Sequence, residues 1–465
     1  MDPAAALDVA AAHARAYLAS TATRPVGPTA GYDEIHARFD RSLPSEGIAP
    51  DAVIAELIDG STDGILAFAS GRFFGYVAGS TLPAALAADW LVSAWDQNTA
   101  LGGATPLAAA VETVAARWLV EVLGLPSATS VGVTTGCQMA HFTCLAAARH
   151  HTLANVGWNV ATDGLRGAPK LRVIVGADRH ATVDVALRHL GLGKPEIVAT
   201  DEQGRMRIDA LADALAGHQG PLIVCAQVGE IHTGDVDPLR PIADIVHRRG
   251  GWLHIDGAFG LWLAASPKRR HLMEGYELAD SWATDGHKWL NVPYDCGFAL
   301  TAHPDAHRAA MSVDASYLVQ GDGRDPMDWT PEFSRRARGL PVWAALRSLG
   351  SDGVAALVDR CCDHAQRLAD GLRRMPDVEV LNEVVSNQVM AHFSDPAGTA
   401  NDRTAAILDM LHRDGTCYPT PSIWRGRTVM RFSICSWATT ADDIDRSLAA
   451  IARAMTSDAS TVKSG

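Results

Sequence analysis

The sequence predicts an α/β protein built on a mostly parallel sheet, and two patterns support that prediction. Short apolar segments with strand character alternate along the chain with segments of helical period, which is typical of parallel sheets. The apolar segment 252–255 also ends in Asp256, and the short segment 281–283 leads into a polar turn that carries His287 and Lys288. The ends of neighbouring parallel strands face one crevice, so Asp256 and Lys288 can meet there.

The bulk composition is that of an ordinary globular protein. The 465 residues are 48% hydrophobic and 20% charged, which suits one large α/β enzyme or two to three ordinary domains. The net charge of −13 argues against a nucleic-acid partner. No run of 18 apolar residues predicts a membrane helix, and the N-terminus lacks the pattern of a signal peptide. The eight cysteines show no metal-site spacing, so we expect no metal and a cytoplasmic location.

The first half of the chain divides into clear elements. Residues 1–60 are predicted to be helical, with a break at 24–31 where two prolines fall. A helical period follows over 107–122, and a strand is expected at 130–134. The further predicted elements are strands at 171–175, 221–226 and 297–300, and helices at 182–190 and 208–215.

The residues from about 345 onward predict a smaller domain. Its expected elements are helices within 351–375 and at 403–414, and strands near 378–380, 388–393 and 428–436.

A strand, a glycine turn and a helix start follow one another at 130–138. Gly136, Cys137 and Gln138 form this turn, and a helix is predicted from there to Arg149. Free backbone N–H groups and the helix dipole make such a helix start suitable for binding a phosphate. A lone glycine turn is more often only a turn, so this motif is weak when taken alone.

Asp256 and Lys288 together suit one cofactor chemistry. A lysine amine can form a Schiff base with an aldehyde, and pyridoxal 5′-phosphate (PLP) also needs a carboxylate beside its ring nitrogen. The small Ala258 would let a flat ring lie against the strand. Taken by itself, the pair fits a structural ion pair at a sheet end equally well.

The wider pattern resembles the group II PLP-dependent decarboxylases. The matching motifs are Asp-x-Ala at 256–258 and His-Lys-Trp at 287–289, followed by Asp-Cys-Gly at 295–297, and the resemblance extends over roughly residues 60–450. It implies PLP fold type I of the aspartate aminotransferase superfamily, with a mostly parallel, mixed seven-stranded sheet. The implied domains are a helical arm at 1–65, a large PLP-binding domain at 66–344, a small α+β domain at 345–455 and a disordered tail at 456–465.

The resemblance also implies residue roles in a homodimer with shared active sites. Lys288 would carry PLP, Asp256 would pair with the ring nitrogen, and His180 would stack on the ring. Tyr317 would donate a proton into the partner's site after CO₂ leaves. The remaining implied cofactor contacts are Gly136, Cys137, Gln138, Thr233, Ala258 and His287, and the implied substrate contacts are Asn98 and Arg431.

The chain departs from the family pattern at several positions. Cys137 and Gln138 replace a second glycine and a hydroxyl residue, and Glu230 and Ile231 stand where threonines are usual. A PLP-dependent amino-acid decarboxylase is nevertheless the expected function. An aminotransferase, an aldolase-type lyase and a non-catalytic binding protein remain the alternatives. No Gly-x-Gly-x-x-Gly follows a first strand, which sets aside a dinucleotide-binding fold.

Overall fold

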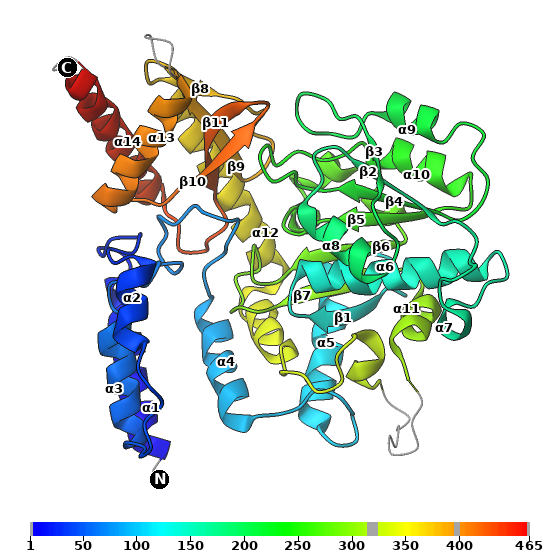
Figure 1. The fold of residues 1–465 in the computed structure, drawn as a ribbon, viewed down its shortest axis with the longest axis horizontal. Helices are drawn as coiled ribbons and strands as arrows, with labels where there is room; N and C mark the ends of the chain where they lie inside the picture. Colours follow the sequence, from blue (N-terminus) through cyan, green and yellow to red (C-terminus); the bar gives the residue numbers. More distant parts are fainter. Residues whose placement is uncertain (1–2, 314–323, 395–399, 463–465) are drawn as a thin grey trace. The chain divides into compact units, whose positions relative to one another are not determined.

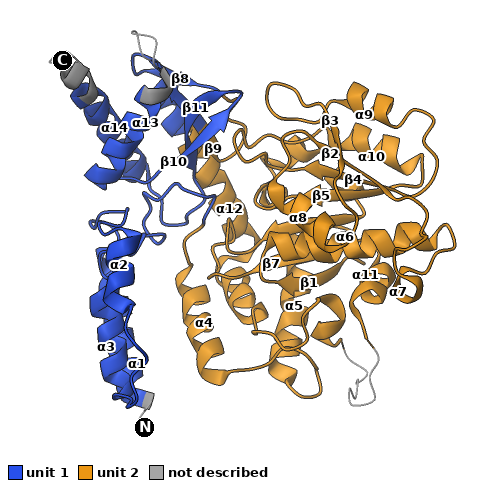
Figure 2. Ribbon diagram, viewed as in Figure 1, with its two compact units in different colours: residues 1–78, 367–381, 390–465 blue, residues 79–366, 382–389 orange. Residues whose placement is uncertain are grey.

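The computed structural model describes residues 3–313, 324–394 and 400–462 (Figure 1). The chain divides into two compact units, shown in Figure 2. The larger unit comprises residues 79–366 and 382–389, and the smaller comprises 1–78, 367–381 and 390–465.

The larger unit is organised around the predicted seven-stranded sheet, in the order β1-β7-β6-β5-β4-β2-β3. Strand β7 is antiparallel to both of its neighbours, whereas the pairs β2–β3, β2–β4, β4–β5 and β5–β6 are parallel. The sheet is therefore mixed and mostly parallel, as the sequence predicts. The strands are β1 (Ser130–Thr134), β2 (Arg172–Gly176), β3 (Glu196–Val198), β4 (Leu222–Gln227), β5 (Trp252–Asp256), β6 (Ser281–Asp285) and β7 (Gly297–Thr301).

Helices surround this sheet because its central strands are apolar on both faces. Every residue of β4, β5 and β6 is buried, which requires cover on both sides. Figure 1 shows α6 and α8 beside these strands, and α6 packs against β6 and β7. The helices of this unit are α4 (Pro83–Trp95), α5 (Pro106–Val122), α6 (Cys137–Ala154), α7 (Val160–Asp163), α8 (Ala181–His189), α9 (Ile208–Ala214), α10 (Leu239–His247) and α11 (Pro304–Met311).

The connection between β5 and β6 consists of three short 3₁₀ segments. These are η1 (Gly260–Ala265), η2 (Arg270–Met273) and η3 (Tyr276–Leu278), and η4 (Pro326–Trp329) lies further along the chain. The connection lets β6 pair in parallel with β5, and the register places Asp256 opposite Ala283. The end of β5 therefore lies beside the end of β6, which leads to Lys288.

The smaller unit joins the N-terminal helices with the C-terminal part of the chain. Its helices are α1 (Pro3–Ser20), α2 (Tyr32–Phe39), α3 (Pro50–Ser61), α13 (Ala400–Asp414) and α14 (Ala441–Val462). Its four-stranded sheet has the order β10-β11-β9-β8, formed by Thr420–Trp424, Arg427–Ser433, Gln388–Phe393 and Val378–Val380. The sequence patterns did not reveal the short strands β3 and β10.

The unit boundaries differ from the predicted domains. The helical arm groups with the C-terminal domain, because backbone bonds such as Val26 N to Gly415 O join the two segments. The segment assigned as α12 (Gly339–Arg373) spans the predicted boundary at 344 and bends at Gly350, whose φ is 65°. Helix α14 continues to Val462, so residues 456–462 are helical rather than a disordered tail.

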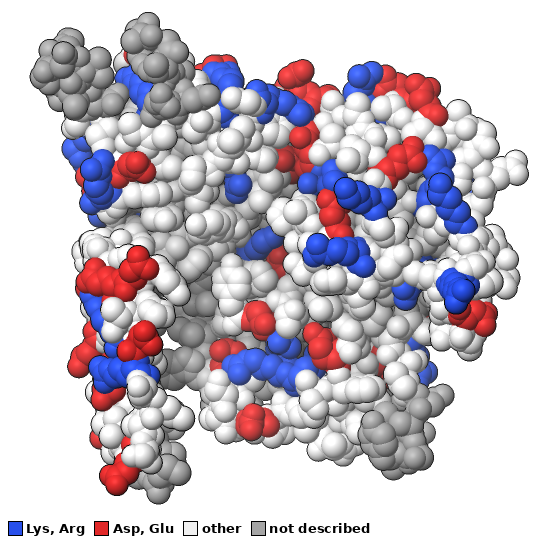
Figure 3. Space-filling view, in the orientation of Figure 1, with Lys and Arg blue, Asp and Glu red and all other residues white. Residues whose placement is uncertain are grey.

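Charged side chains of both signs are interspersed on the face shown in Figure 3. Many form ion pairs in the structure, such as Arg367 with Asp445 at 2.6 Å. Among the described helices, none combines the length and apolarity needed to cross a membrane.

Candidate active site

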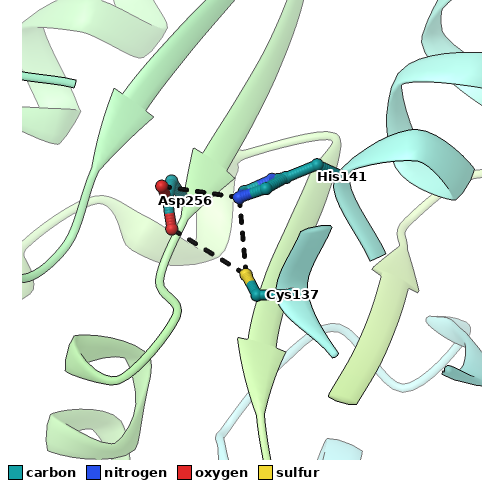
Figure 4. Close-up of side chains that lie close together, drawn as sticks. All are labelled: Cys137, His141 and Asp256. Carbon is teal, nitrogen blue, oxygen red and sulfur yellow. Dashed lines mark hydrogen bonds and ion pairs between the residues drawn. The ribbon is translucent and has the colours of Figure 1, made fainter. Parts of the chain in front are cut away.

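Asp256 ends β5 and is only 5% exposed. Its Oδ1 accepts a hydrogen bond from the backbone N–H of Ala258 at 3.1 Å, and its Oδ2 lies 3.4 Å from Nε2 of His141 (Figure 4). Burial alone would raise the pKa of this carboxyl group. The positive field of His141 opposes burial most strongly, followed by those of His180 and Lys288, and the net pKa lies below its usual range. Asp256 is therefore a buried carboxylate that stays ionised.

Lys288 follows β6 by three residues in a tight turn. The amide of Asn291 donates to the carbonyl of Trp289 at 2.8 Å, and Asn291 itself has a φ of 56°, a conformation that asparagine tolerates. The backbone of Gly79 packs directly on this turn, since a Cβ there would lie 1.9 Å from the carbonyl oxygen of Lys288. The position of the lysine thus depends on a distant glycine.

The ammonium group of Lys288 lies 3.0 Å from Oδ2 of Asp285, the last residue of β6. Burial lowers the pKa of Lys288, but the Asp285 carboxylate raises it and the net pKa is raised. The Asp285 carboxylate therefore favours the protonated form of the Lys288 amine.

His180 caps the N-terminus of α8. Its Nδ1 accepts from the backbone N–H of Thr182 at 3.3 Å, which fixes the ring at the start of the helix. Burial lowers the pKa of His180, the carboxylate of Asp256 acts against that, and Lys288 lowers it further. The three predicted groups from β5, the turn after β6 and the start of α8 are thus close enough to influence one another.

The predicted phosphate cradle lies at the start of α6. A Cβ at Gly136 would lie 3.2 Å from Cε1 of His287, so a larger residue would crowd the start of the helix. The N–H of Cys137 donates to Oδ1 of Asp285 at 2.5 Å. The next N–H groups of the first turn, those of Gln138 and Met139, have no partner within a helix by geometry.

His287 is held in place beside this helix start. Its Nδ1 accepts from the N–H of Cys296 at 3.1 Å, and its ring stacks on Tyr294 with centroids 4.3 Å apart. Burial lowers the pKa of His287. The ring is thus fixed between the lysine turn and the glycine turn.

Thr233 belongs to a loop that is held together by Glu230. The Glu230 carboxylate accepts from the backbone N–H groups of His232 at 2.6 Å and Thr233 at 2.8 Å, and also contacts Nδ1 of His232 at 2.8 Å. The hydroxyl of Thr233 donates to the carbonyl of Gln203 at 2.8 Å. Glu230 therefore closes its own turn, and the described contacts of Thr233 do not join it to Lys288.

Three further predicted residues are not brought to Lys288 by described contacts. Oδ1 of Asn98 accepts a hydrogen bond from the backbone N–H of Arg335 at 3.1 Å, so this side chain holds the segment at Arg335. Arg431 lies in β11 and is 7% exposed, but it belongs to the smaller unit. Tyr317 lies outside the described residues. The roles predicted for these three residues remain predictions.

The sequence reasoning missed three residues that shape the site. Asp285 stands three residues before Lys288. An acidic residue so close in sequence to a reactive amine could have indicated an ion pair with it. His141 follows Cys137 by four residues, which places both on one helix face. No sequence pattern connects Gly79 with Lys288.

The residues present fit PLP. The carboxylate of Asp256, the amine of Lys288 and the ring of His180 lie close enough to influence one another, and the glycine turn at the start of α6 lies beside His287. Among the described lysines, those at 170, 194 and 268 are exposed, whereas the side chain of Lys288 is only 19% exposed. The partly buried Lys288 amine can capture an aldehyde once it has lost its proton.

Comparisons with known proteins agree with this chemistry. The family model described as "Pyridoxal-dependent decarboxylase conserved domain" matches residues 34–393. Tryptophan decarboxylase 1 of Oryza sativa subsp. japonica is 29% identical over 456 residues, covering 90% of this chain and 87% of that protein. 4-Hydroxyphenylacetaldehyde synthase of Rhodiola rosea is 26% identical over 420 residues, covering 86% and 84%.

The fold has close relatives among solved structures. The structure of Oryza sativa TDC with PLP and tryptamine superposes with a TM-score of 0.90 at 24% identity, covering 98% of this chain and 99% of that one. The chain therefore belongs to the pyridoxal-dependent decarboxylase family. It is a PLP-dependent amino-acid decarboxylase, and hence a lyase.

Proposed function

We propose that this enzyme removes CO₂ from an aromatic L-amino acid, using PLP bound covalently to Lys288. The observation that carries the proposal is that the partly buried Lys288, the ionised Asp256 and His180 lie close enough to shift one another's pKa. The substrate class is supported by the names of relatives, which include tryptophan decarboxylase and aromatic-L-amino-acid decarboxylase. PLP supplies an electron-accepting ring that stabilises the carbon from which CO₂ departs.

The protein's own residues would bind and orient this ring. Asp256 would accept a hydrogen bond from the protonated ring nitrogen, and His180 would lie against the ring face. Ala258 is small and half-buried beside Asp256, which leaves room for a flat group. His287 would form part of the wall between the lysine turn and the cradle.

The phosphate would bind at the start of α6. Gly136 provides the open approach, and Cys137 and Gln138 begin the helix. Because the N–H of Cys137 already donates to Asp285, the phosphate would rely on the N–H of Gln138 and its successor. Thr233 would then support the site through its loop.

Substrate contacts are proposed for Asn98 and Arg431, the latter because a guanidinium can grip a carboxylate in bidentate fashion. Tyr317 is proposed to return a proton to the substrate carbon. This last role requires a homodimer in which each chain contributes to the other's site. Sedimentation of the holoenzyme at several concentrations tests the dimer, and a monomer at all of them would contradict it.

A cytoplasmic location is also proposed. Its support is that the eight cysteines are all free and buried, as suits a reducing compartment. Fractionation of the native cells with an antibody against the chain tests the location, and recovery outside the cytoplasm would contradict it.

The decisive test of function is a panel of L-amino acids with purified holoenzyme. CO₂, amine, aldehyde and keto acid are measured together for each substrate. We expect CO₂ and amine in equal amounts from an aromatic substrate. Keto acid without CO₂ from every amino acid would contradict decarboxylation, and activity confined to acidic or aliphatic substrates would contradict the substrate class.

The attachment site is tested separately from turnover. Borohydride reduction of the holoenzyme followed by peptide mapping should place the pyridoxyl group on Lys288. Lys268 serves as the internal control, since its side chain is 73% exposed and therefore more open to reagents than that of Lys288. A label on Lys268 at the same level would argue against a specific attachment site.

A further inference from the structure

A chain of buried side chains lies behind the Asp256 carboxylate. His141, on α6, is fully buried, and its Nε2 lies 3.4 Å from Oδ2 of Asp256 (Figure 4). Its other ring nitrogen, Nδ1, lies 2.9 Å from Nε2 of His254 on β5. Nε2 of His141 also lies 3.4 Å from Sγ of Cys137. One ring nitrogen therefore faces the carboxylate and a thiol, and the other faces a second imidazole.

The series of hydrogen bonds ends at Trp252, whose indole N–H can donate but not accept. Nδ1 of His254 lies 2.9 Å from Oγ of Ser281, and that oxygen accepts from Nε1–H of Trp252 at 2.8 Å. An indole nitrogen only donates, so one lone pair of the Ser281 hydroxyl is committed. The hydroxyl keeps its own proton, which it can donate to Nδ1 of His254.

His254 is neutral in this chain. Burial, and then the neighbouring His141, lower the pKa of His254 to about 3. His254 therefore carries one ring proton at neutral pH, and that proton can lie on either nitrogen. Each position dictates what His141 presents to Asp256.

When Ser281 donates to Nδ1 of His254, the proton of His254 lies on Nε2 and is donated to Nδ1 of His141. The ring proton of a neutral His141 then lies on Nε2, which faces Asp256. When the proton of His254 lies on Nδ1 instead, His141 must donate from its own Nδ1. Its Nε2 would then turn a lone pair toward the carboxylate unless His141 is doubly protonated. The repulsive arrangement is the one in which a neutral His141 turns a lone pair toward Asp256. In the other two, with His141 either neutral and protonated on Nε2 or doubly protonated, His141 offers an N–H to Asp256.

The burial of Asp256 makes its contact with His141 important for the carboxylate. Asp256 is 5% exposed, and its Oδ1 is already fixed by the N–H of Ala258. The contact with His141 fixes the second oxygen, so the carboxylate plane is held from two sides. A buried carboxylate without such a partner would bind a proton more readily.

We propose that His141 is a positioning residue that holds Asp256 as an oriented carboxylate facing the ring nitrogen of the cofactor. The proposal rests on the role of Asp256 in the function proposed above. It assigns His141 no contact with the reacting atoms. It predicts that loss of His141 weakens the recognition of a protonated ring nitrogen and leaves the rest of cofactor binding in place.

The alternative role for His141 and Asp256 is to bind a metal ion together with Cys137. Donor atoms of Cys137, His141 and Asp256 lie within 4.8 Å of one another. A metal there would take the carboxylate that the ring nitrogen needs, so the two arrangements exclude each other. Metal analysis of the purified holoenzyme comes first. One equivalent of tightly bound transition metal that His141→Asn abolishes would overturn the proposal.

The test compares dissociation constants for two cofactors. One is PLP and the other is its 1-deaza analogue, in which C–H replaces the ring nitrogen. The preference for PLP over the analogue isolates the contact with the ring nitrogen from the phosphate and lysine contacts. We expect His141→Asn to reduce this preference roughly ten- to hundredfold, the range for one hydrogen bond to a charged group, with little change for the analogue.

The matched control is His307→Asn. His307 is also fully buried and also has both ring nitrogens engaged, by Ser130 Oγ at 2.9 Å and the Trp329 carbonyl at 3.0 Å. This variant should keep the preference for PLP. An unchanged preference in His141→Asn, or equal weakening of both cofactors, would overturn the proposal.

Asp256→Ala separates this inference from the proposed function. If Asp256→Ala keeps the preference, then Asp256 does not pair with the ring nitrogen, and both proposals fail. If Asp256→Ala loses the preference but His141→Asn keeps it, only the inference about His141 fails. His141→Gln should recover part of the preference, because its longer side chain can place an amide N–H near the position of Nε2, whereas the amide of Asn reaches only about the position of Nδ1.

A measurement on the wild type stands even if the variants fail to fold. The holoenzyme is loaded with PLP labelled with ¹⁵N in the ring, and the ¹⁵N resonance is recorded near neutral pH. We expect the position of a protonated pyridine. The position of a neutral pyridine would overturn the proposal.

Discussion

Asp285→Asn should move the pH at which the apoenzyme captures PLP. Only the neutral amine of Lys288 attacks an aldehyde, and the pKa of Lys288 is raised by the Asp285 carboxylate at 3.0 Å. Asparagine keeps the shape of the side chain and removes its charge. Capture in the wild type should therefore rise with pH, and capture in the variant should begin at lower pH.

The size of the shift follows from the distance between the two charges. At 3.0 Å and an effective dielectric constant of about 20, the attraction is about 5 kcal/mol, or on the order of four pKa units. The side chain of Lys288 is 19% exposed, so solvent screens part of this attraction. We expect a shift of roughly two units or more toward lower pH.

The assay is stopped-flow absorbance of PLP mixed with apoenzyme across a pH series. Asp295→Asn is the matched control, because Asp295 follows the same turn but its carboxylate pairs with Arg338 at 2.8 Å. The midpoint of the control should stay near that of the wild type. An unchanged midpoint in Asp285→Asn, or an equal shift in both variants, would refute the electrostatic reasoning.

Three further predictions test the site from other directions. Gly79→Ala should weaken PLP binding at least tenfold, because its Cβ would lie 1.9 Å from the carbonyl oxygen of Lys288. Gly103→Ala, whose Cβ would meet open space, should leave the affinity unchanged. Equal affinities of the two variants by fluorescence titration would contradict this reasoning. The pKa of His254 is lowered to about 3, so its neutral form stabilises the fold fully above pH 6.5 and progressively less below it. The free energy of unfolding should accordingly fall by about 2 to 3 kcal/mol more between pH 6.5 and 4.5 in the wild type than in His254→Asn; parallel denaturation curves would refute that assignment. Finally, mixed dimers of Lys288→Ala and Tyr317→Phe chains should regain about half of the normal sites, since one site per pair is intact if Tyr317 acts across the interface. No recovery of amine formation after proven subunit exchange would count against that arrangement.

The sequence by itself determined the sheet and its reactive ends. Strand β1 lies at the predicted residues, and the strands leading to Asp256 and Lys288 begin at the predicted residues and run one or two residues further. These signals were strong because a strand buried on both faces must be apolar and ends where polar residues begin. Strand β3 has only three residues, and the five residues of β10 are not buried throughout, so neither strand was recognised as a continuous apolar run.

The tertiary structure alone decided what surrounds the two key side chains. Lys288 pairs with Asp285, and Asp256 contacts His141, which comes from a helix more than a hundred residues earlier in the chain. The close approach of Gly79 to the lysine turn is equally distant in sequence. Periodicity and motifs report which face of an element is buried, but not which element packs on it. The pKa of a buried group depends on the charges of the side chains packed around it. It can therefore be inferred from the tertiary structure but not from the sequence.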